Sequence, residues 1–163
     1  MAAALNPMLK RLFRAPAHLY RWGWGALLGR RFLLLIHTGR RTGQRRETVL
    51  EVMEYRPAGG EAIVMSAFGR RADWLQNLQA DPDPEVVIGR RRFVAAYRIL
   101  DAGEAASVVR GYEQRHRVIA PLVRAALSRL LGWRYRGSEQ DRRRLVQQLP
   151  LIAFCPRPES PWH

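Results

Sequence analysis

Apolar residues in the middle and at the end of the chain fall in short runs that are typical of β-strands. Val, Ile, Leu and aromatic side chains dominate these runs, and Gly or Pro residues separate them, as expected for strands joined by turns. We therefore predict strands at Phe32–Thr38, Thr48–Tyr55, Glu61–Ser66, Glu85–Ile88, Arg92–Leu100 and Pro150–Phe154. The first three indicate an antiparallel meander, and the next two flank Gly89 as a further hairpin.

Helical spacing and helix-capping residues predict the helices between and after these strands. They are a short helix around Trp74, Leu75 and Leu78 that ends at Asp81-Pro82, a helix from Asp101 to about Arg117, a continuation from Val118 to Leu131 across Pro121, and a helix from Ser138 to Gln148. Asp101 with Glu104, three residues later, resembles a capping box, and Ser138 with Asp141 marks a second helix start.

Strands with helices inserted among them favour a small α+β barrel over repeated βαβ units. The 163 residues fit one domain, because such a chain can bury a real core but is too short for two. We expect an N-terminal amphipathic helical segment (residues 1–31), a barrel domain (residues 32–156) and a tail (residues 157–163).

The N-terminal segment carries apolar residues at helical spacing beside basic residues and two tryptophans. The apolar members are Leu5, Met8, Leu9, Leu12, Phe13, Trp22 and Trp24. Its apolar runs are too short for a membrane span, and Arg21 interrupts them, which argues against a signal peptide. Such a segment can lie in a membrane interface or cover an open barrel edge. We expect a cytoplasmic protein that is either free or peripheral on the inner face of the membrane.

Charge narrows the classes of partner. The chain has 28 basic and 14 acidic residues, a net charge of +14, and Lys10 is its only lysine. This surplus attracts anions such as nucleic acid, acidic lipid or a polyanionic cofactor, although arginines also solvate surfaces. We expect no nucleic-acid partner, because the arginines are not interleaved with stacking aromatic residues and no known module is present. Cys155 stands alone and four histidines are scattered, so we expect neither disulfide nor metal site.

Two connections between elements carry candidate chemistry. The first, Gly39–Arg46, combines two glycines with four arginines, so that main-chain N–H groups and guanidinium groups can both approach an anion. It lacks the Gly-Lys-Ser/Thr ending of a nucleotide-binding loop. The second, Ser66–Leu78, joins a strand to a helix, where free N–H groups and Arg70 can face an anion. Each alone is also compatible with a plain connection.

Together these stretches resemble the deazaflavin-dependent nitroreductase family, which includes quinone and nitro reductases that use coenzyme F-420. The motifs are Leu-Leu-Leu-x-x-Thr-Gly-Arg-Arg-Thr-Gly, a hairpin strand, Ser-x-x-Gly, and Asp-Trp-x-x-Asn-Leu-x-Ala-Asp-Pro. The resemblance covers residues 32–100 well and continues more loosely to Pro156. It implies a single-domain split β-barrel of the FMN-binding type with a basic cofactor groove.

The resemblance also implies roles for individual residues. Facing the phosphate and glutamate tail of the coenzyme would be Arg40, Arg41, Thr42, Gly43, Gln44 and Arg46. Lying along the deazaflavin ring would be Ser66, Ala67, Phe68 and Gly69, with Arg70 beside them and Trp74 and Asn77 bracing that wall. Some nitroreducing members have a lysine near Ala67 and a longer loop here, so this chain departs from the family at its reaction pocket.

These features predict an enzyme that transfers hydride from reduced F-420 to a lipophilic, electron-poor acceptor such as a quinone or a nitro compound. A nonenzymatic carrier of F-420 or of a lipid acid would use the same basic groove, and FMN could replace the deazaflavin. The catalytic proton donor is the least defined role, and Ser66 and Tyr112 are the candidates. No hydrolytic site is expected, because neither Ser66 nor the Glu47/Glu51 pair has the partners that such a site needs.

Overall fold

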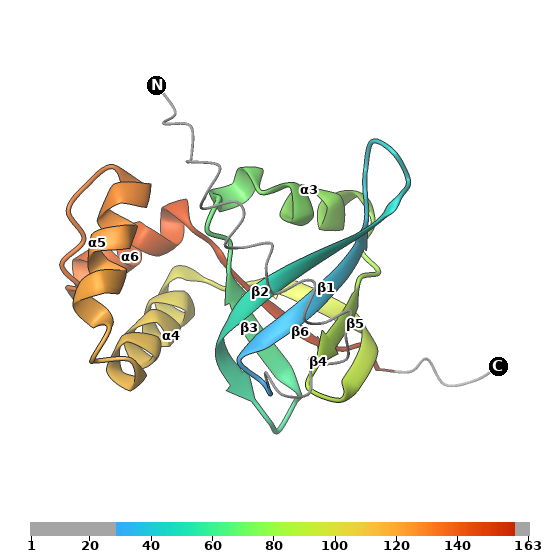
Figure 1. The fold of residues 1–163 in the computed structure, drawn as a ribbon, viewed down its shortest axis with the longest axis horizontal. Coiled ribbons are helices and arrows are strands. Elements are labelled where there is room, and N and C mark those ends of the chain that lie inside the picture. Colours follow the sequence, from blue (N-terminus) through green and yellow to red (C-terminus); the bar gives the residue numbers. More distant parts are fainter. Residues whose placement is uncertain (1–28, 159–163) are drawn as a thin grey trace.

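The computed structural model describes residues 29–158 of the chain. Six antiparallel strands close into a barrel in the order β1-β2-β3-β6-β5-β4 (Figure 1). The strands are β1 (Phe32–Thr38), β2 (Arg45–Arg56), β3 (Glu61–Met65), β4 (Glu85–Ile88), β5 (Arg91–Ile99) and β6 (Leu151–Pro156). All six predicted strands are confirmed, and the chain folds as the expected α+β split barrel. Strand β2 begins earlier than predicted, because Arg45 still pairs with Thr38 across the β1–β2 hairpin.

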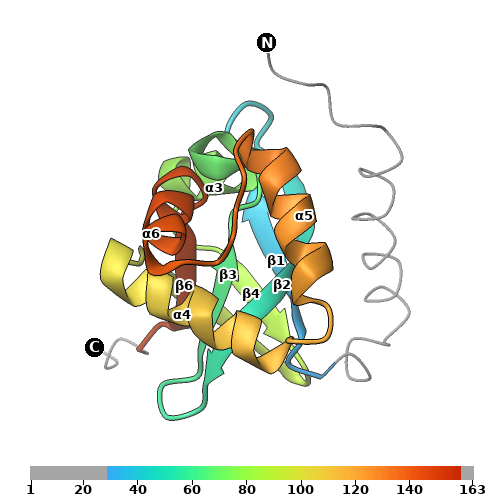
Figure 2. The same ribbon diagram turned by 90° about the vertical axis from the view of Figure 1, so that its left-hand side faces the viewer.

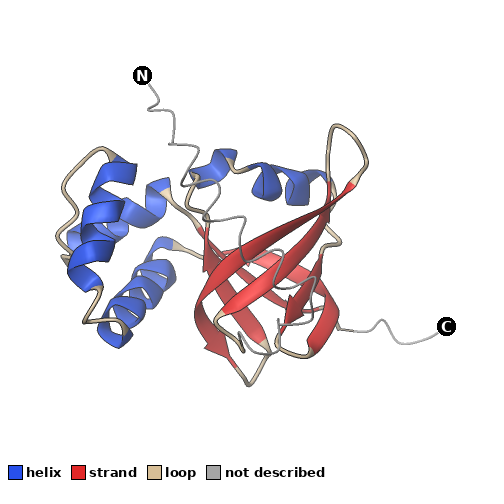
Figure 3. Ribbon diagram, in the orientation of Figure 1, coloured by secondary structure: helices blue, strands red, loops and turns tan. Residues whose placement is uncertain are grey.

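The helices lie at two places around the barrel (Figures 1 and 3). The short 3-10 helix η2 (Gly69–Arg71) and α3 (Asp73–Ala80) lie across one end. A lobe beside the barrel holds α4 (Ala102–Arg115), α5 (Ala120–Leu131) and α6 (Glu139–Gln148), and Figure 2 views the molecule from the side of this lobe.

Alternate side chains of β3 and β6 enter two different cores, because successive residues of a strand point to opposite faces. Ile152 and Phe154 face the barrel interior with Trp74, Leu75 and other buried side chains. Leu151 and Ala153 face outward and pack with residues of α4 and α6. Strand β6 is therefore apolar along its whole length. Strands β3 and β6 form the wall that the barrel core and the helical lobe share.

Two details of the predicted helices are wrong. The helical pattern does not continue through residues 116–119, because α4 ends at Arg115 and α5 begins at Ala120. Pro121 lies in the first turn of α5, where a backbone N–H has no partner within the helix, so the missing N–H of proline costs no hydrogen bond. Asp101 does cap α4, but Glu104 does not complete a capping box. Its carboxylate instead binds Arg56 and Arg98 at 2.7 Å each. At α6 the predicted box of Ser138 and Asp141 is present.

The N-terminal segment predicted to be amphipathic lies outside the described residues except for its last three positions. The proposed division at residues 31 and 156 thus stays a prediction, as does the membrane role of that segment. Within residues 29–158 no helix has the length and apolar character that crossing a bilayer requires.

Candidate cofactor site

The β1–β2 hairpin is fastened to α3 by one arginine. The backbone N–H of Arg40 donates to Asn77 Oδ1 (3.1 Å) and its Nη1 donates to the same oxygen (2.9 Å). Its Nη2 also donates to Asp73 Oδ1 at 3.1 Å. The two stretches singled out in the sequence, 37 positions apart at this contact, are therefore brought side by side at one end of the barrel.

Beneath this contact Asn77 is held by a buried histidine. Its Nδ2 lies 3.1 Å from His37 Nδ1, and His37 Nε2 lies 3.1 Å from Thr48 Oγ1. Asn77 accepts from Arg40 through its oxygen, so its amide nitrogen must donate to a His37 nitrogen that carries no proton. The ring is then neutral with its hydrogen on Nε2. Burial lowers the pKa of His37, the charge of Arg46 lowers it further, and Asp73 acts in the opposite direction.

The turn of the hairpin depends on its two glycines. Gly43 has a φ of +64°, a conformation that residues with a Cβ rarely adopt. A Cβ at Gly39 would lie 2.8 Å from Arg46 Nε, so this glycine leaves room for the Arg46 side chain. Inside the turn Gly43 N donates to Gly39 O (2.8 Å), and Gln44 N donates to Thr42 Oγ1 (3.3 Å). Thr42, Gly43 and Gln44 thus shape the loop.

Several exposed arginines around this junction have no carboxylate partner in the described part of the chain. They are Arg41, Arg45, Arg46, Arg70 and Arg71. Other arginines of the barrel are paired: Arg56 and Arg98 contact Glu61 and Glu104. Unpaired guanidinium groups beside a hairpin of fixed shape form a surface that attracts anions and can bind them in bidentate fashion.

The predicted ring loop, residues 66–71, is a compact turn with one exposed aromatic side chain. Ser66 is fully buried, and its Oγ donates to Gly69 O at 2.7 Å. Gly69 has a φ of +67°, and a Cβ there would lie 2.9 Å from Gln148 O of α6. Phe68, in contrast, is 49% exposed. The loop therefore presents Phe68 to the surface on a turn that Ser66 and Gly69 hold.

The two residues expected to brace the wall both lie inside it. Trp74 is buried, with its ring 6.4 Å from that of Phe154, and so anchors the start of α3 in the barrel core. Asn77 is buried and makes the contacts with Arg40 and His37 described above. Both support the site from within.

The structure does not bring the two candidate proton donors together. The Ser66 hydroxyl is buried and already donates to a carbonyl oxygen. Tyr112, on α4, donates to Glu51 Oε1 at 2.8 Å, and Glu51 lies six residues along β2 from Arg45, roughly 20 Å at the rise of a strand. Burial and then the Glu51 contact raise the pKa of Tyr112 to about 12. This geometry gives neither hydroxyl support as the donor, and the role stays a prediction.

Reasoning from the sequence missed His37, Thr48 and Asp73, which hold the junction together. The available signal was the period of β1: His37 is two positions from Leu35 and four from Leu33, both of which face the barrel interior. A histidine in that register faces the interior and needs polar partners there, which is a signal that applies to His37 and not to Thr48 or Asp73.

The residues at this end of the barrel fit an anionic deazaflavin. The fit rests on the unpaired guanidinium groups of the hairpin, among them Arg46, whose side chain occupies the room that Gly39 leaves. Exposed Phe68 adds an apolar surface on the neighbouring loop. Across residues 29–158 no group of three or more His, Cys, Asp and Glu residues could hold a metal ion.

Several solved structures are similar to this chain in fold. HutZ, the heme storage protein from Vibrio cholerae, is 12% identical with a TM-score of 0.50, over 85% of this chain and 89% of that one. A protein of unknown function from Agrobacterium tumefaciens is 14% identical with a TM-score of 0.50, over 86% of this chain and 54% of that one. At this identity the likeness shows a shared split-barrel fold.

A solved F-420-H2 dependent reductase, FDR-A, is 17% identical with a TM-score of 0.49, over 78% of this chain and 96% of that one. No curated protein matches the chain. The family model described as F-420H(2)-dependent quinone reductase matches residues 13–118, which is more than half of the chain. The chain therefore belongs to the F-420H2-dependent quinone reductase family. It is an oxidoreductase of a family whose cofactor is reduced F-420, as the sequence predicted.

Proposed function

We propose that this reductase holds the anionic tail of F-420 on the β1–β2 hairpin and its ring along residues 66–70, and passes a hydride to a lipophilic, electron-poor acceptor. The observation that carries the proposal is the contact of Arg40 with Asn77 and Asp73. It unites the basic hairpin and the loop that carries Phe68 into one surface. When bound, reduced F-420 supplies the hydride.

The residues of the hairpin divide into those that bind and those that position. Arg41 and Arg46 have exposed guanidinium groups without carboxylate partners in the described chain, and they contact the tail. Arg40 positions the hairpin, because its side chain is already held by Asp73 and Asn77. Thr42, Gly43 and Gln44 give the loop the shape in which Arg41 and Arg46 stand on one surface.

The ring loop supplies an apolar surface rather than an acid. Phe68 is the exposed member, and it favours a flat, lipophilic acceptor such as a quinone over a compact polar nitro compound. Trp74 and Asn77 support the loop from the barrel core. We assign no proton transfer to Ser66, because its hydroxyl holds the turn at Gly69.

Fluorescence titration with F-420, with FMN in parallel, tests the proposal. Arg41→Ala and Arg46→Ala should each weaken F-420 binding by about 1.5–3 kcal/mol, since each removes a charged hydrogen bond. Arg143→Ala, an exposed arginine on α6, is the matched control and should leave binding unchanged. If all three variants bind F-420 with equal affinity at low salt, Arg41 and Arg46 are solvated surface residues that do not bind the coenzyme. Tighter binding of FMN than of F-420 would contradict the choice of cofactor.

A further inference from the structure

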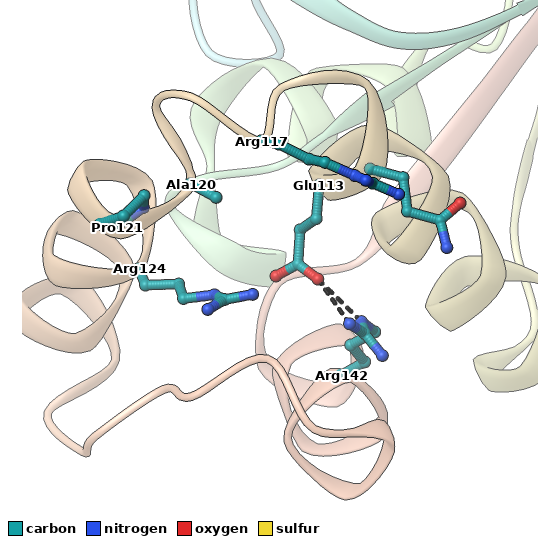
Figure 4. A pocket seen from close by; sticks show the side chains of 7 residues that line it. Glu113, Arg117, Ala120, Pro121, Arg124 and Arg142 are labelled. Carbon is teal, nitrogen blue, oxygen red and sulfur yellow. Dashed lines mark hydrogen bonds and ion pairs between the residues drawn. The ribbon is translucent and has the colours of Figure 1, made fainter.

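A second arginine-lined hollow lies in the helical lobe, away from the hairpin. It has a volume of about 250 Å³ and is bounded by the end of α4, the first turn of α5 and the start of α6 (Figure 4). Its lining contains three arginines and one glutamate, and none of the residues of the cofactor site. Its role is therefore a separate question from the binding of F-420.

Both oxygens of the glutamate in this hollow have hydrogen-bond partners. Glu113 is buried, and its Oε2 accepts from Arg142 Nε (2.9 Å) and Nη2 (2.7 Å). Its Oε1 accepts from the hydroxyl of Tyr135 at 2.7 Å. The charge of Arg142 is thus compensated, and in the described chain Glu113 makes no ion pair with the other two arginines.

Arg117 and Arg124 are the uncompensated members. Neither has an ion pair with any carboxylate of residues 29–158, and Figure 4 shows their side chains reaching into the hollow on either side of Glu113. Arg124 lies against Gly137, where a Cβ would come within 2.9 Å of its Nε. That Nε is buried and has no hydrogen-bond partner.

A buried N–H group without an acceptor costs about 1–3 kcal/mol, and such groups are rare in folded proteins. Arg124 Nε itself is closed off from solvent, so a ligand in the hollow would meet the terminal nitrogens of Arg124. Two uncompensated guanidinium groups favour a doubly charged acceptor over a neutral one, and planar guanidinium groups match the oxygens of a phosphate.

We infer that this hollow binds a phosphate group, as inorganic phosphate or as a phosphate monoester, through Arg117 and Arg124. The oxygens of the phosphate accept from the terminal nitrogens of Arg124 and from the exposed guanidinium of Arg117. Glu113 and Arg142 form the floor of the site. Because Glu113 forms its ion pair with Arg142, the charge of Arg124 is left for the phosphate. Tyr135 holds Glu113 in place.

Isothermal titration calorimetry with inorganic phosphate, on the full chain in phosphate-free buffer at constant ionic strength, tests this inference. Arg124→Gln and Arg117→Gln should each weaken phosphate binding about 10-fold or more, since each removes a charged hydrogen bond. Arg129→Gln, an exposed arginine of α5 outside the lining, should leave it unchanged. Arg117 is exposed, so its variant tests the site even if Arg124→Gln perturbs packing.

Vesicles distinguish the source of the phosphate. We compare binding to phosphatidylcholine vesicles with and without phosphatidic acid, whose head group is a phosphate monoester. Binding that needs phosphatidic acid and fails in Arg117→Gln, without saturable binding of inorganic phosphate, identifies a lipid head group. Saturable binding of inorganic phosphate identifies the free ion. If neither probe distinguishes the two lining variants from Arg129→Gln, the inference is overturned.

Discussion

At the scale of single residues, the protonation state of His37 determines the hydrogen bonds that join β1, β2 and α3 at this end of the barrel. The neutral ring accepts a hydrogen bond from Asn77 on one side and contacts Thr48 on the other. Protonation would place an N–H against the Asn77 amide, so that two donors face each other. A site that depends on one protonation state of a buried histidine has a stability that depends on pH.

We expect the free energy of unfolding to fall as pH is lowered, in proportion to the protonation of His37. The pKa of folded His37 lies below its ordinary value of 6.5 because of burial and of Arg46, so the unfolded chain binds the proton more readily. The contribution is therefore complete above about pH 6.5 and is lost as pH falls through the lower folded pKa. Loss of the buried hydrogen bond would cost about 1–3 kcal/mol.

Denaturant titrations between pH 7.5 and pH 4.5 measure this effect. His37→Phe should be less stable at neutral pH but should show a flatter dependence on pH, because the titrating ring is gone. His116→Gln, which removes a partly exposed histidine of the α4 C-cap, should keep the slope of the wild type. Parallel curves for the wild type and His37→Phe would show that His37 does not titrate in this way.

At the scale of elements, the two helix starts of the lobe differ although their sequences look alike. Ser138 and Asp141 exchange hydrogen bonds across the first turn of α6. Asp101 caps α4 alone, because Glu104 is drawn away by Arg56 and Arg98. These two arginines lower the pKa of Glu104 to about 2, which keeps its carboxylate charged and bound to them rather than to the helix.

Replacement of either residue of the α6 capping box should therefore destabilise the protein. Ser138→Ala and Asp141→Ala should each lower the free energy of unfolding by about 1 kcal/mol, within the range for helix caps. The double variant should cost less than the sum of the two, since the bonds are reciprocal. Gln140→Ala, exposed in the same turn, is the control. Thermal unfolding of the four variants gives the comparison, and additive losses would argue against a box.

The strands and most helices could be predicted from the sequence because their periods are local. The break at residues 116–119 could not, since Val118, Ile119 and Leu122 continue the apolar pattern while the structure leaves them exposed. The hairpin arginines were found from composition and from the family resemblance. Their division into a positioning Arg40 and unpaired Arg41 and Arg46 depends on Asp73 and Asn77, more than 30 positions away, and no local pattern contains that contact.

At the scale of the whole molecule, the charge of +14 is distributed unevenly. Ion pairs gather where β5 and α4 meet the barrel wall, as in the cluster of Arg56, Arg98, Glu61 and Glu104. The end of the barrel that carries the hairpin also has Glu47, Asp73 and Glu85, but Arg41, Arg45 and Arg46 form no ion pair with a carboxylate of the described chain. We expect these unpaired charges to attract the anionic cofactor to that end and to make its binding sensitive to salt.

The proposed reductase should prefer lipophilic acceptors. In the loaded protein, a menaquinone analogue should oxidise the bound reduced F-420 faster than a compact polar nitroaromatic compound does, because Phe68 offers an apolar surface. Phe68→Ala should reduce the quinone rate about 10-fold, the effect of losing about 1.4 kcal/mol of apolar contact.

Stopped-flow absorbance of the loaded protein gives both rates. Faster reaction with the nitroaromatic compound would contradict the role of Phe68 without touching the family assignment. Tight binding of the reduced coenzyme with no oxidation above the protein-free rate would instead indicate a carrier.

The position of β6 also governs how this protein can be made. β6 follows α6 in the chain, yet it pairs with β3 on one side and β5 on the other. During synthesis the barrel cannot close until residues 151–156 have left the ribosome, and until then β3 and β5 keep open edges that can pair with other chains. The pairings of β6 with β3 and β5 therefore form late and join distant positions, which predicts slow folding. A nascent chain stalled before Leu151 should depend on chaperones to stay unaggregated.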